Sequence, residues 1–152
     1  MPLTVEDQPY CLLVHPVDET ITGDGVDNQV PLEFTTTQHN VGGCTVNSAK
    51  SRITVPIAGT YLLSTVISGG TQTASAGDGI QLKFLKNGSQ ILESVAFPMD
   101  TMGTNDGEEF AFTMALPIPL AASDYIEVCL DNVGATVSAT VQRGYFSVVK
   151  LH

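Results

Sequence analysis

Apolar and polar residues alternate along this chain with a period of two, and no stretch shows the repeat of an amphipathic helix. The alternation is clear in residues 61–67, 80–84, 110–116, 126–131 and 136–141. Turn residues interrupt it about every ten residues, as in proteins built from short strands. About seven or eight such strands without a helix predict an all-β fold, either a sandwich, a barrel or a jelly roll.

Turn residues and prolines predict where two of these strands end. Asn87-Gly88 favours a type I′ hairpin, so a return strand is expected from 90 to about 97. Pro117 and Pro119 lack the backbone N–H that a ladder needs. We expect them to end the strand that covers residues 110–116.

Charge is scarce and one-sided, because 6 Lys and Arg face 16 Asp and Glu, for a net charge of −10. So few basic residues cannot neutralise a nucleic-acid backbone, and an anionic membrane would repel the chain, so neither is an expected partner. At 152 residues, of which 43% are apolar, the chain can bury the core of one domain. We expect Phe112 and Phe146 in that core.

The cysteines, Cys11, Cys44 and Cys129, are odd in number and lack CxxC spacing. They predict neither a disulfide framework nor a zinc site, and we expect reduced, mostly buried thiols. The first residues lack the basic and apolar segments of a secretory signal, which together with the thiols predicts a reducing compartment.

Residues 1–28 differ from the remainder, because they combine three prolines and several acidic residues with one apolar patch. We divide the chain into an N-terminal arm at 1–28 and a β-domain at 29–152. The patch contains Tyr10, Leu12, Leu13 and Val14 and is too apolar to remain in water, so it predicts a docking surface for a partner. The alternative is an extra, ordinary first strand of the sandwich.

Histidine and serine residues do not form a catalytic pattern. His15, His39 and His152 are scattered, and neither Ser64 nor Ser147 lies in the Gly-x-Ser-x-Gly turn of a serine hydrolase. No pair of histidines has a chelating spacing. We therefore expect a protein that is not an enzyme and has no cofactor.

Acidic residues in two loops are weak candidates for calcium, namely Asp24 and Asp27 in a Gly-rich turn and Asp106 and Glu108 in a second loop that also holds Asp100 and Glu109. Hard oxygen ligands on loops suit this ion, but the spacing matches no EF-hand, and ordinary solvated loops explain the residues better. The long loop at 69–79 has small polar residues and no phosphate-binding motif, so it is either a contact loop or a mobile tip.

Four segments follow one another in the second part of the chain, namely SRITVPIAGTY at 51–61, IQLKFLKNG at 80–88, residues 116–130 with LAASDYIEV, and GYFSVV at 144–149. In this order they resemble the C1q/tumour-necrosis-factor-like jelly roll. In the third segment Ser123 replaces the family's usual Gly, and in the fourth Val148 replaces another. The resemblance covers about Val30 to Leu151.

The resemblance implies a jelly-roll sandwich of ten strands that assembles as a tight homotrimer around an apolar axis. Two features of the residues agree with a subunit contact. Residues 61–67 are apolar on both faces, and such a strand is covered on both sides by a second sheet or a neighbouring subunit. Small residues form one face of the strand at 110–116. We expect the trimer interface to contain Tyr61, Leu63, Ala111, Thr113 and Ala115.

The sequence shows neither a collagen-like stalk nor a signal peptide, and the same fold serves on the surfaces of bacteriophages and other viruses. We therefore predict a non-enzymatic structural protein, a trimeric decoration or cement protein on a phage or viral capsid. Its partner would be the major capsid protein or another virion component, and it would be made in host cytoplasm. One alternative is the receptor- or glycan-binding tip of a virion fibre, favoured by loop-exposed Tyr125 or Tyr145. Another is a secreted C1q-like recognition domain.

Overall fold

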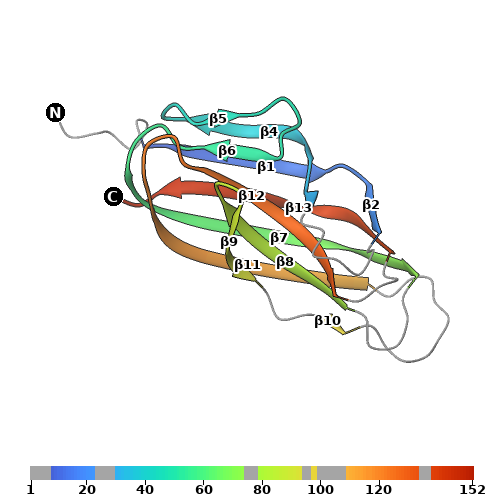
Figure 1. Cartoon of the computed structure of the whole chain (residues 1–152). Coiled ribbons are helices and arrows are strands. Elements are labelled where there is room, and N and C mark those ends of the chain that lie inside the picture. Colours follow the sequence, from blue (N-terminus) through green and yellow to red (C-terminus); the bar gives the residue numbers. More distant parts are fainter. Residues whose placement is uncertain (1–7, 23–29, 74–78, 94–96, 99–108, 134–137) are drawn as a thin grey trace.

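The computed structural model describes residues 8–22, 30–73, 79–93, 97–98, 109–133 and 138–152, and every regular element in these ranges is a β-strand. The strands form two antiparallel sheets, seen in Figure 1 as two layers that overlap in the view. The described residues contain no helix long and apolar enough to cross a membrane.

One sheet, called sheet A, has six strands. Its path runs through β11 (Glu109–Leu120), β7 (Gly59–Thr73), β13 (Ser138–Lys150), β1 (Tyr10–Pro16) and β4 (Phe34–Val41), and β2 (Glu19–Thr22) also pairs with β13.

The other sheet, called sheet B, has seven strands. Its path runs through β10 (Phe97–Pro98), β8 (Gly79–Lys86), β12 (Tyr125–Val133), β6 (Arg52–Thr54) and β5 (Thr45–Val46), while β3 (Val30–Pro31) pairs with β12 and β9 (Ser89–Glu93) pairs with β8.

The core lies between the two sheets, because each long strand directs alternate large side chains inward. Phe146 of β13 is fully buried, with its ring centre 6.5 Å from that of Phe34 in sheet A and 6.1 Å from that of Phe84 in sheet B. Phe112 of β11 is also buried, beside Phe110. The predicted all-β sandwich and the predicted burial of Phe112 and Phe146 are confirmed.

The apolar patch near the N-terminus forms a strand inside sheet A. β1 lies between β13 and β4 and pairs with both, so the alternative of an extra first strand describes Tyr10–Pro16. The reason is burial on one face of the strand, since Cys11 and Leu13 are inaccessible to solvent. The remainder of the proposed arm, 1–7 and 23–28, lies outside the described residues.

The prediction that Pro117 and Pro119 end their strand is wrong. β11 continues through both prolines to Leu120 and pairs with β7 along its whole length. It can do so because β11 is an edge strand that pairs with β7 on one side only. Every second residue of such a strand directs its N–H away from the ladder, so a proline is tolerated there.

The predicted hairpin at Asn87-Gly88 is confirmed, with φ of 51° and 79° at its two turn residues. The return strand is shorter than expected, since β9 ends at Glu93. Phe97 and Pro98 form β10, a separate short strand on β8.

Candidate functional site

The candidate site is the outer face of sheet A, the face turned away from the core. In β7 the burial alternates, so that Tyr61 and Leu63 are fully buried while Leu62, Ser64 and Val66 remain partly exposed. The expected placement of Tyr61 and Leu63 at a subunit interface is therefore wrong. This strand is apolar on both faces, and its larger side chains fill the core of its own sandwich.

The outer-face residues lie in rows across four strands because the strands pair in register. Each of three neighbouring rows contains one residue from each of β1, β13, β7 and β11, in that order. The rows are Tyr10–Val149–Leu62–Pro117, Leu12–Ser147–Ser64–Ala115 and Val14–Tyr145–Val66–Thr113.

At the centre of these rows, the Oγ atoms of Ser64 and Ser147 share a hydrogen bond of 2.7 Å. Of the histidines considered for catalysis, His39 extends the row of these serines, because it pairs with Leu12 from β4. Leu12 stands between it and Ser147, and the His39 ring stacks on Tyr10 with ring centres 5.8 Å apart. The His15 carbonyl accepts from Thr35, and the His152 carbonyl accepts from the Thr60 N–H. The serines therefore pair with one another and not with a general base.

The side chains of β11 on the outer face are small and project little from the sheet. Ala111, Thr113 and Ala115 are exposed there, opposite the inward-facing Phe112 and Met114. Their position on an edge strand leaves room for another surface to approach closely.

Three of the four predicted docking residues belong to this same face. Tyr10, Leu12 and Val14 are partly exposed and line a depression of about 380 Å³ with Ser64 and Tyr145. Leu13 has no exposed surface, and its prediction as a docking residue is wrong, because it points into the core on the opposite face of β1.

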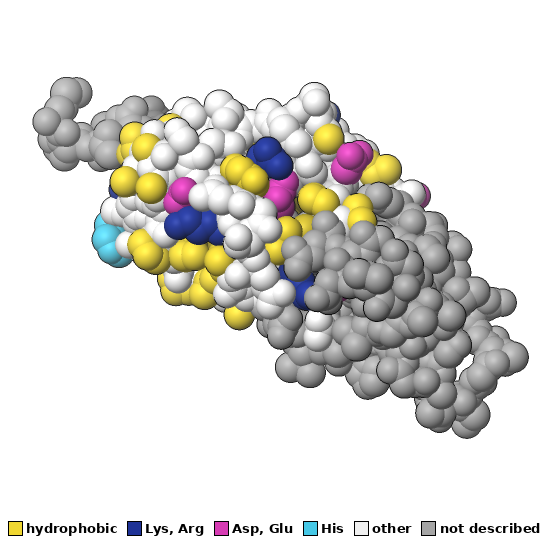
Figure 2. All heavy atoms as spheres, in the orientation of Figure 1, with side chains coloured by type: hydrophobic (Ala, Val, Ile, Leu, Met, Phe, Trp, Pro, Cys, Tyr) yellow, Lys and Arg dark blue, Asp and Glu magenta, His cyan; other side chains and the backbone are white. Residues whose placement is uncertain are grey.

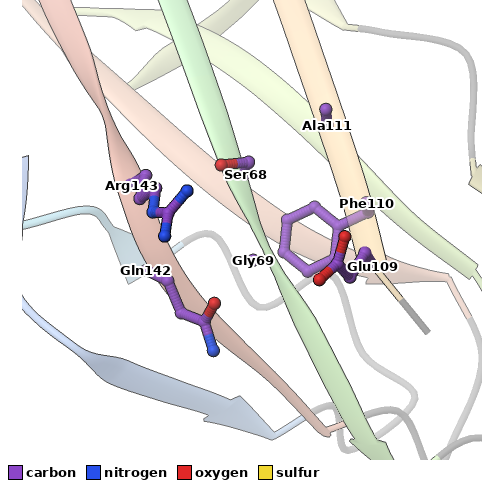
Figure 3. Close-up of a pocket in the computed structure, with 7 residues that line it drawn as sticks. All are labelled: Ser68, Gly69, Glu109, Phe110, Ala111, Gln142 and Arg143. Carbon is purple, nitrogen blue, oxygen red and sulfur yellow. The ribbon is translucent and has the colours of Figure 1, made fainter. Parts of the chain in front are cut away.

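A second depression, of about 360 Å³, lies at the Glu109 end of β11 (Figure 3). Here β13 bulges between Val141 and Arg143, and both Gln142 and Arg143 are exposed. A bulge inserts one residue and re-aims a side chain, which explains why two consecutive residues face outward. The lining residues are Ser68, Gly69, Glu109, Phe110, Ala111, Gln142 and Arg143.

Two glycines allow β7 and β13 to pack closely beside this bulge. A Cβ at Gly69 would lie 2.0 Å from the carbonyl oxygen of Thr140, and a Cβ at Gly144 would lie 2.2 Å from that of Val66. Gly144 also has a φ of 156°. Larger residues at either position would force the strands apart, so the glycines maintain the bulge geometry.

Glu109 and Arg143 are the only charged residues among those that line the two depressions. Figure 3 shows them on opposite sides of the second depression, with β7 between their strands. The sequence interpretation missed Arg143, and it considered Glu109 only among the acidic residues of a loop. The available signal was the pair Gln142-Arg143, two polar residues in succession that interrupt the alternation between Val141 and Tyr145.

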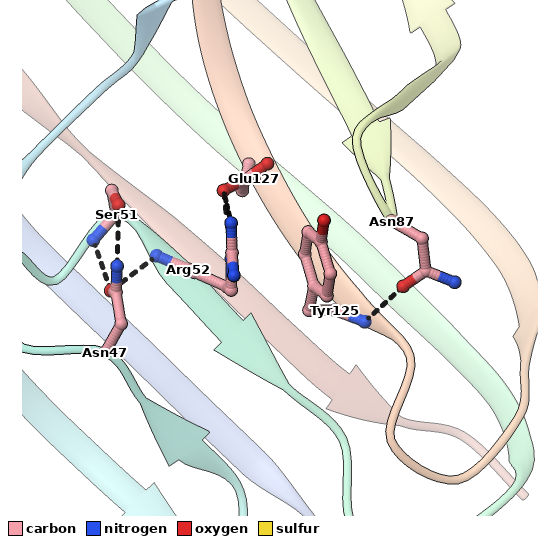
Figure 4. A network of polar contacts seen from close by, with 6 residues as sticks. All are labelled: Asn47, Ser51, Arg52, Asn87, Tyr125 and Glu127. Atoms are coloured by element: carbon pink, nitrogen blue, oxygen red, sulfur yellow. Dashed lines mark hydrogen bonds and ion pairs between the residues drawn. The ribbon is translucent and has the colours of Figure 1, made fainter.

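The described ion pairs lie on sheet B instead, and Figure 2 shows basic and acidic side chains adjoining one another on one face of the molecule. Arg52 donates to Glu127 Oε1 from Nε at 3.0 Å and Nη2 at 2.8 Å, and its guanidinium carbon lies 3.8 Å from the ring centre of Tyr125 (Figure 4). Asn47 fixes the backbone before this arginine by accepting from the N–H groups of Ser51 and Arg52.

A turn beside this network carries the strongly shifted carboxyl of Asp124. Hydrogen bonds from Asn87 and Lys86 and from the Ala121 N–H lower the pKa of Asp124 from 3.8 to about 2. Asn87 also accepts from the Tyr125 N–H at 2.9 Å. These contacts connect the β8–β9 turn to the turn between β11 and β12, which is a structural role.

The calcium candidates Asp24, Asp27, Asp106 and Glu108 lie outside the described residues, as does 74–78 of the loop at 69–79. Residues 69–73 of that loop belong to β7. In the part of the chain that is described, no group of three or more His, Cys, Asp or Glu residues is arranged to hold a metal ion.

Comparison with known proteins identifies the architecture. No protein-family model and no curated protein sequence matches this chain. Among solved structures it is similar to Eiger TNF from S. frugiperda, with a TM-score of 0.67 over 95% of this chain and 94% of that one. The chain has a TNF-like jelly-roll fold.

The sequence identity to that structure is 13%, so the likeness describes the fold. It confirms the TNF/C1q-like jelly roll that the four sequence segments predicted. The virion role stays a prediction. The site that this TNF-like jelly roll offers for function is thus the outer face of sheet A, with its apolar rows and the charged depression at one end.

Proposed function

We propose that this TNF-like jelly roll is a non-enzymatic protein that works as a homotrimer, with the outer face of sheet A buried between three copies. The observation that carries the proposal is the absence of charge in the three rows of that face. None of their residues is Asp, Glu, Lys or Arg, although the chain holds 16 acidic residues. An extended, partly apolar surface rimmed by polar residues is typical of a protein interface.

Two further features support close packing of copies on this face. The Ser64–Ser147 hydrogen bond satisfies polar atoms that would otherwise lose water on burial. The small residues Ala111, Thr113 and Ala115 lie at the edge of the sheet, where a neighbouring copy would enter. Cyclic closure then gives every copy the same two contacts.

Sedimentation equilibrium of the full chain at micromolar concentration tests the trimer. The expected mass is about three times 16.1 kDa. A monomer of 16.1 kDa throughout that range would overturn the proposal.

We infer a structural role for the trimer on the surface of a virion, as a decoration protein that binds the assembled shell. Its low content of basic residues argues against a nucleic-acid partner, and the serines at the centre of the face pair with one another, which supports a structural role. A protein that binds only the assembled shell stabilises it by mass action. Immunogold imaging of native particles with antibodies to the recombinant trimer is the test, and unlabelled particles would overturn this role.

The alternative of a glycan-binding tip receives less support from the described aromatic residues. Tyr125 lies under Arg52, and Tyr145 lies in a row of the sheet A face and not in a loop. Specific binding of the trimer to a glycan array would favour that alternative.

A further inference from the structure

Arg143 and Glu109 are charged residues at one end of a face whose neighbouring rows carry no charge. The ion pairs within the described part of the chain are Arg52–Glu127, Lys83–Asp131 and Lys86–Asp124. Arg143 and Glu109 therefore have no ion-pair partner among the described residues, and both side chains are exposed.

The two side chains of one copy belong to strands separated by β7. Arg143 pairs in register with Ser68 of β7, which in turn pairs with Ala111 of β11, and Glu109 lies two residues before Ala111. Adjacent strands are about 4.8 Å apart, so β13 and β11 are about 10 Å apart. Figure 3 shows the open depression between the two side chains.

The local backbone is arranged so that the arginine faces outward. Without the bulge between Val141 and Arg143, strict alternation from the buried Val141 would direct residue 143 into the core. Gly69 and Gly144 permit the close strand packing at this bulge. The sheet thus departs from regular pairing at the place where it presents a positive charge.

We propose that Arg143 of each copy forms an ion pair with Glu109 of a neighbouring copy, so that three such pairs close the trimer at this end. This inference rests on the trimer proposed above. A ring needs two different patches on each copy, and here one is on the inner strand β13 and the other on the edge strand β11. The second copy is the occupant because it brings the opposite charge to each residue.

The physical reason is the cost of burying charge. An arginine enclosed in an interface without an acidic partner loses its hydration and gains nothing in return, whereas a paired one is compensated. The pairs also select one arrangement of the copies, because a rotated or shifted copy would place like charges together or leave both unpaired. The uncharged rows provide the area that is buried between copies, and the ion pairs at the charged depression fix how the copies align.

The test is a charge-reversal cycle on the full chain, with Arg143→Glu, Glu109→Arg and the double variant. Matched controls change the net charge equally at exposed or partly exposed positions outside this face, namely Lys50→Glu and Glu33→Arg. Trimer dissociation is followed by sedimentation over a dilution series, and circular dichroism checks that each variant remains folded.

Each single reversal is expected to weaken the trimer by about tenfold or more, because it opposes like charges in three places. The double variant is expected to return to within about threefold of the wild type, and the controls to stay there. A trimeric wild type with single reversals no weaker than the controls would overturn the pairing and leave the proposed trimer standing. Weak single variants that the double change does not rescue would also overturn the pairing, and a monomeric wild type would overturn the trimer itself.

Discussion

The hydroxyl groups of Ser64 and Ser147 lie 2.7 Å apart at the centre of the outer face of sheet A, one on β7 and the other on β13. Each supplies the hydrogen-bond partner that water would otherwise supply. A polar pair that is satisfied within one copy loses little when a neighbouring copy excludes solvent. The pair therefore makes the face suitable for burial without making it apolar.

Adding a charge at this position tests the role of the face. In Ser64→Asp a carboxylate would be buried between copies without a basic partner, and we expect trimer affinity to fall by about tenfold or more. The matched control is Ser48→Asp, at an exposed position in the turn between β5 and β6. Light scattering after size exclusion measures both. If Ser64→Asp assembles as tightly as Ser48→Asp, the face is not buried in the trimer.

Phe146 links the two sheets, because its ring lies near Phe34 in one and Phe84 in the other. Phe146→Ala would leave a cavity where the sheets meet, and we expect it to lower the free energy of unfolding by about 3–5 kcal/mol. Val17→Ala is the control, since Val17 is 38% exposed, and it should change stability by less than about 0.5 kcal/mol. Urea unfolding at one fixed protein concentration compares them, and equal midpoints would contradict the assigned core.

The cysteines are free and buried as predicted, and burial changes their acidity. Desolvation raises the pKa of the Cys11 and Cys129 thiols from 9.0 to about 12 and that of Cys44 to about 11. We expect a disulfide reagent at about pH 8 to leave the native protein almost unlabelled and to label all 3 cysteines in concentrated guanidinium chloride. Rapid labelling of the native protein would contradict this burial.

The raised pKa values of the thiols also predict how the stability of the protein changes with pH, which unfolding measurements at several pH values can check. The thiols remain neutral in the folded state but ionise near pH 9.0 in the unfolded chain. Their contribution to stability is complete below that pH and declines as the pH rises toward the folded pKa values of about 11 and about 12.

Asp124 shifts in the opposite direction, which predicts acid sensitivity. Its pKa is lowered from 3.8 to about 2, mainly by the hydrogen bond from Asn87. Its contribution is present above the unfolded pKa and is lost as the pH falls from 3.8 to about 2. Asp124→Asn should therefore lose less stability than the wild type across that window. Chemical denaturation at several pH values measures this, and parallel curves for the two proteins would contradict the assignment.

The local pattern of residues was sufficient to predict the strands but not their neighbours. Alternation in 110–116 identified an inward Phe112 and an outward Ala111, because side-chain direction in a strand depends only on adjacent residues. Tyr10–Val14 reads the same in sequence whether it docks on a partner or pairs with β13. That choice depends on residues near position 149, far along the chain.

Two further errors also concern context that one stretch of sequence does not contain. Pro117 and Pro119 are tolerated because β11 is the edge of sheet A, and edge position follows from the order of all the strands. Arg143 faces outward because of a bulge in β13. The succession Gln142-Arg143 is consistent with a bulge, but only the pairing with β7 establishes it.

Removal of residues 1–28 is the most direct test of how the N-terminal part contributes. The deletion takes β1 out of the middle of sheet A, separates β4 from β13, and exposes core residues that Cys11 and Leu13 now cover. We therefore expect an aggregated or unfolded product, because a central strand cannot be lost without unpaired backbone on both sides. A shorter deletion of residues 1–7 keeps all of β1 and serves as the control. Thermal melting and near-ultraviolet circular dichroism would compare the two. A 1–28 deletion that melts cooperatively, as the wild type does, would show that β1 is dispensable and restore the docking-arm interpretation.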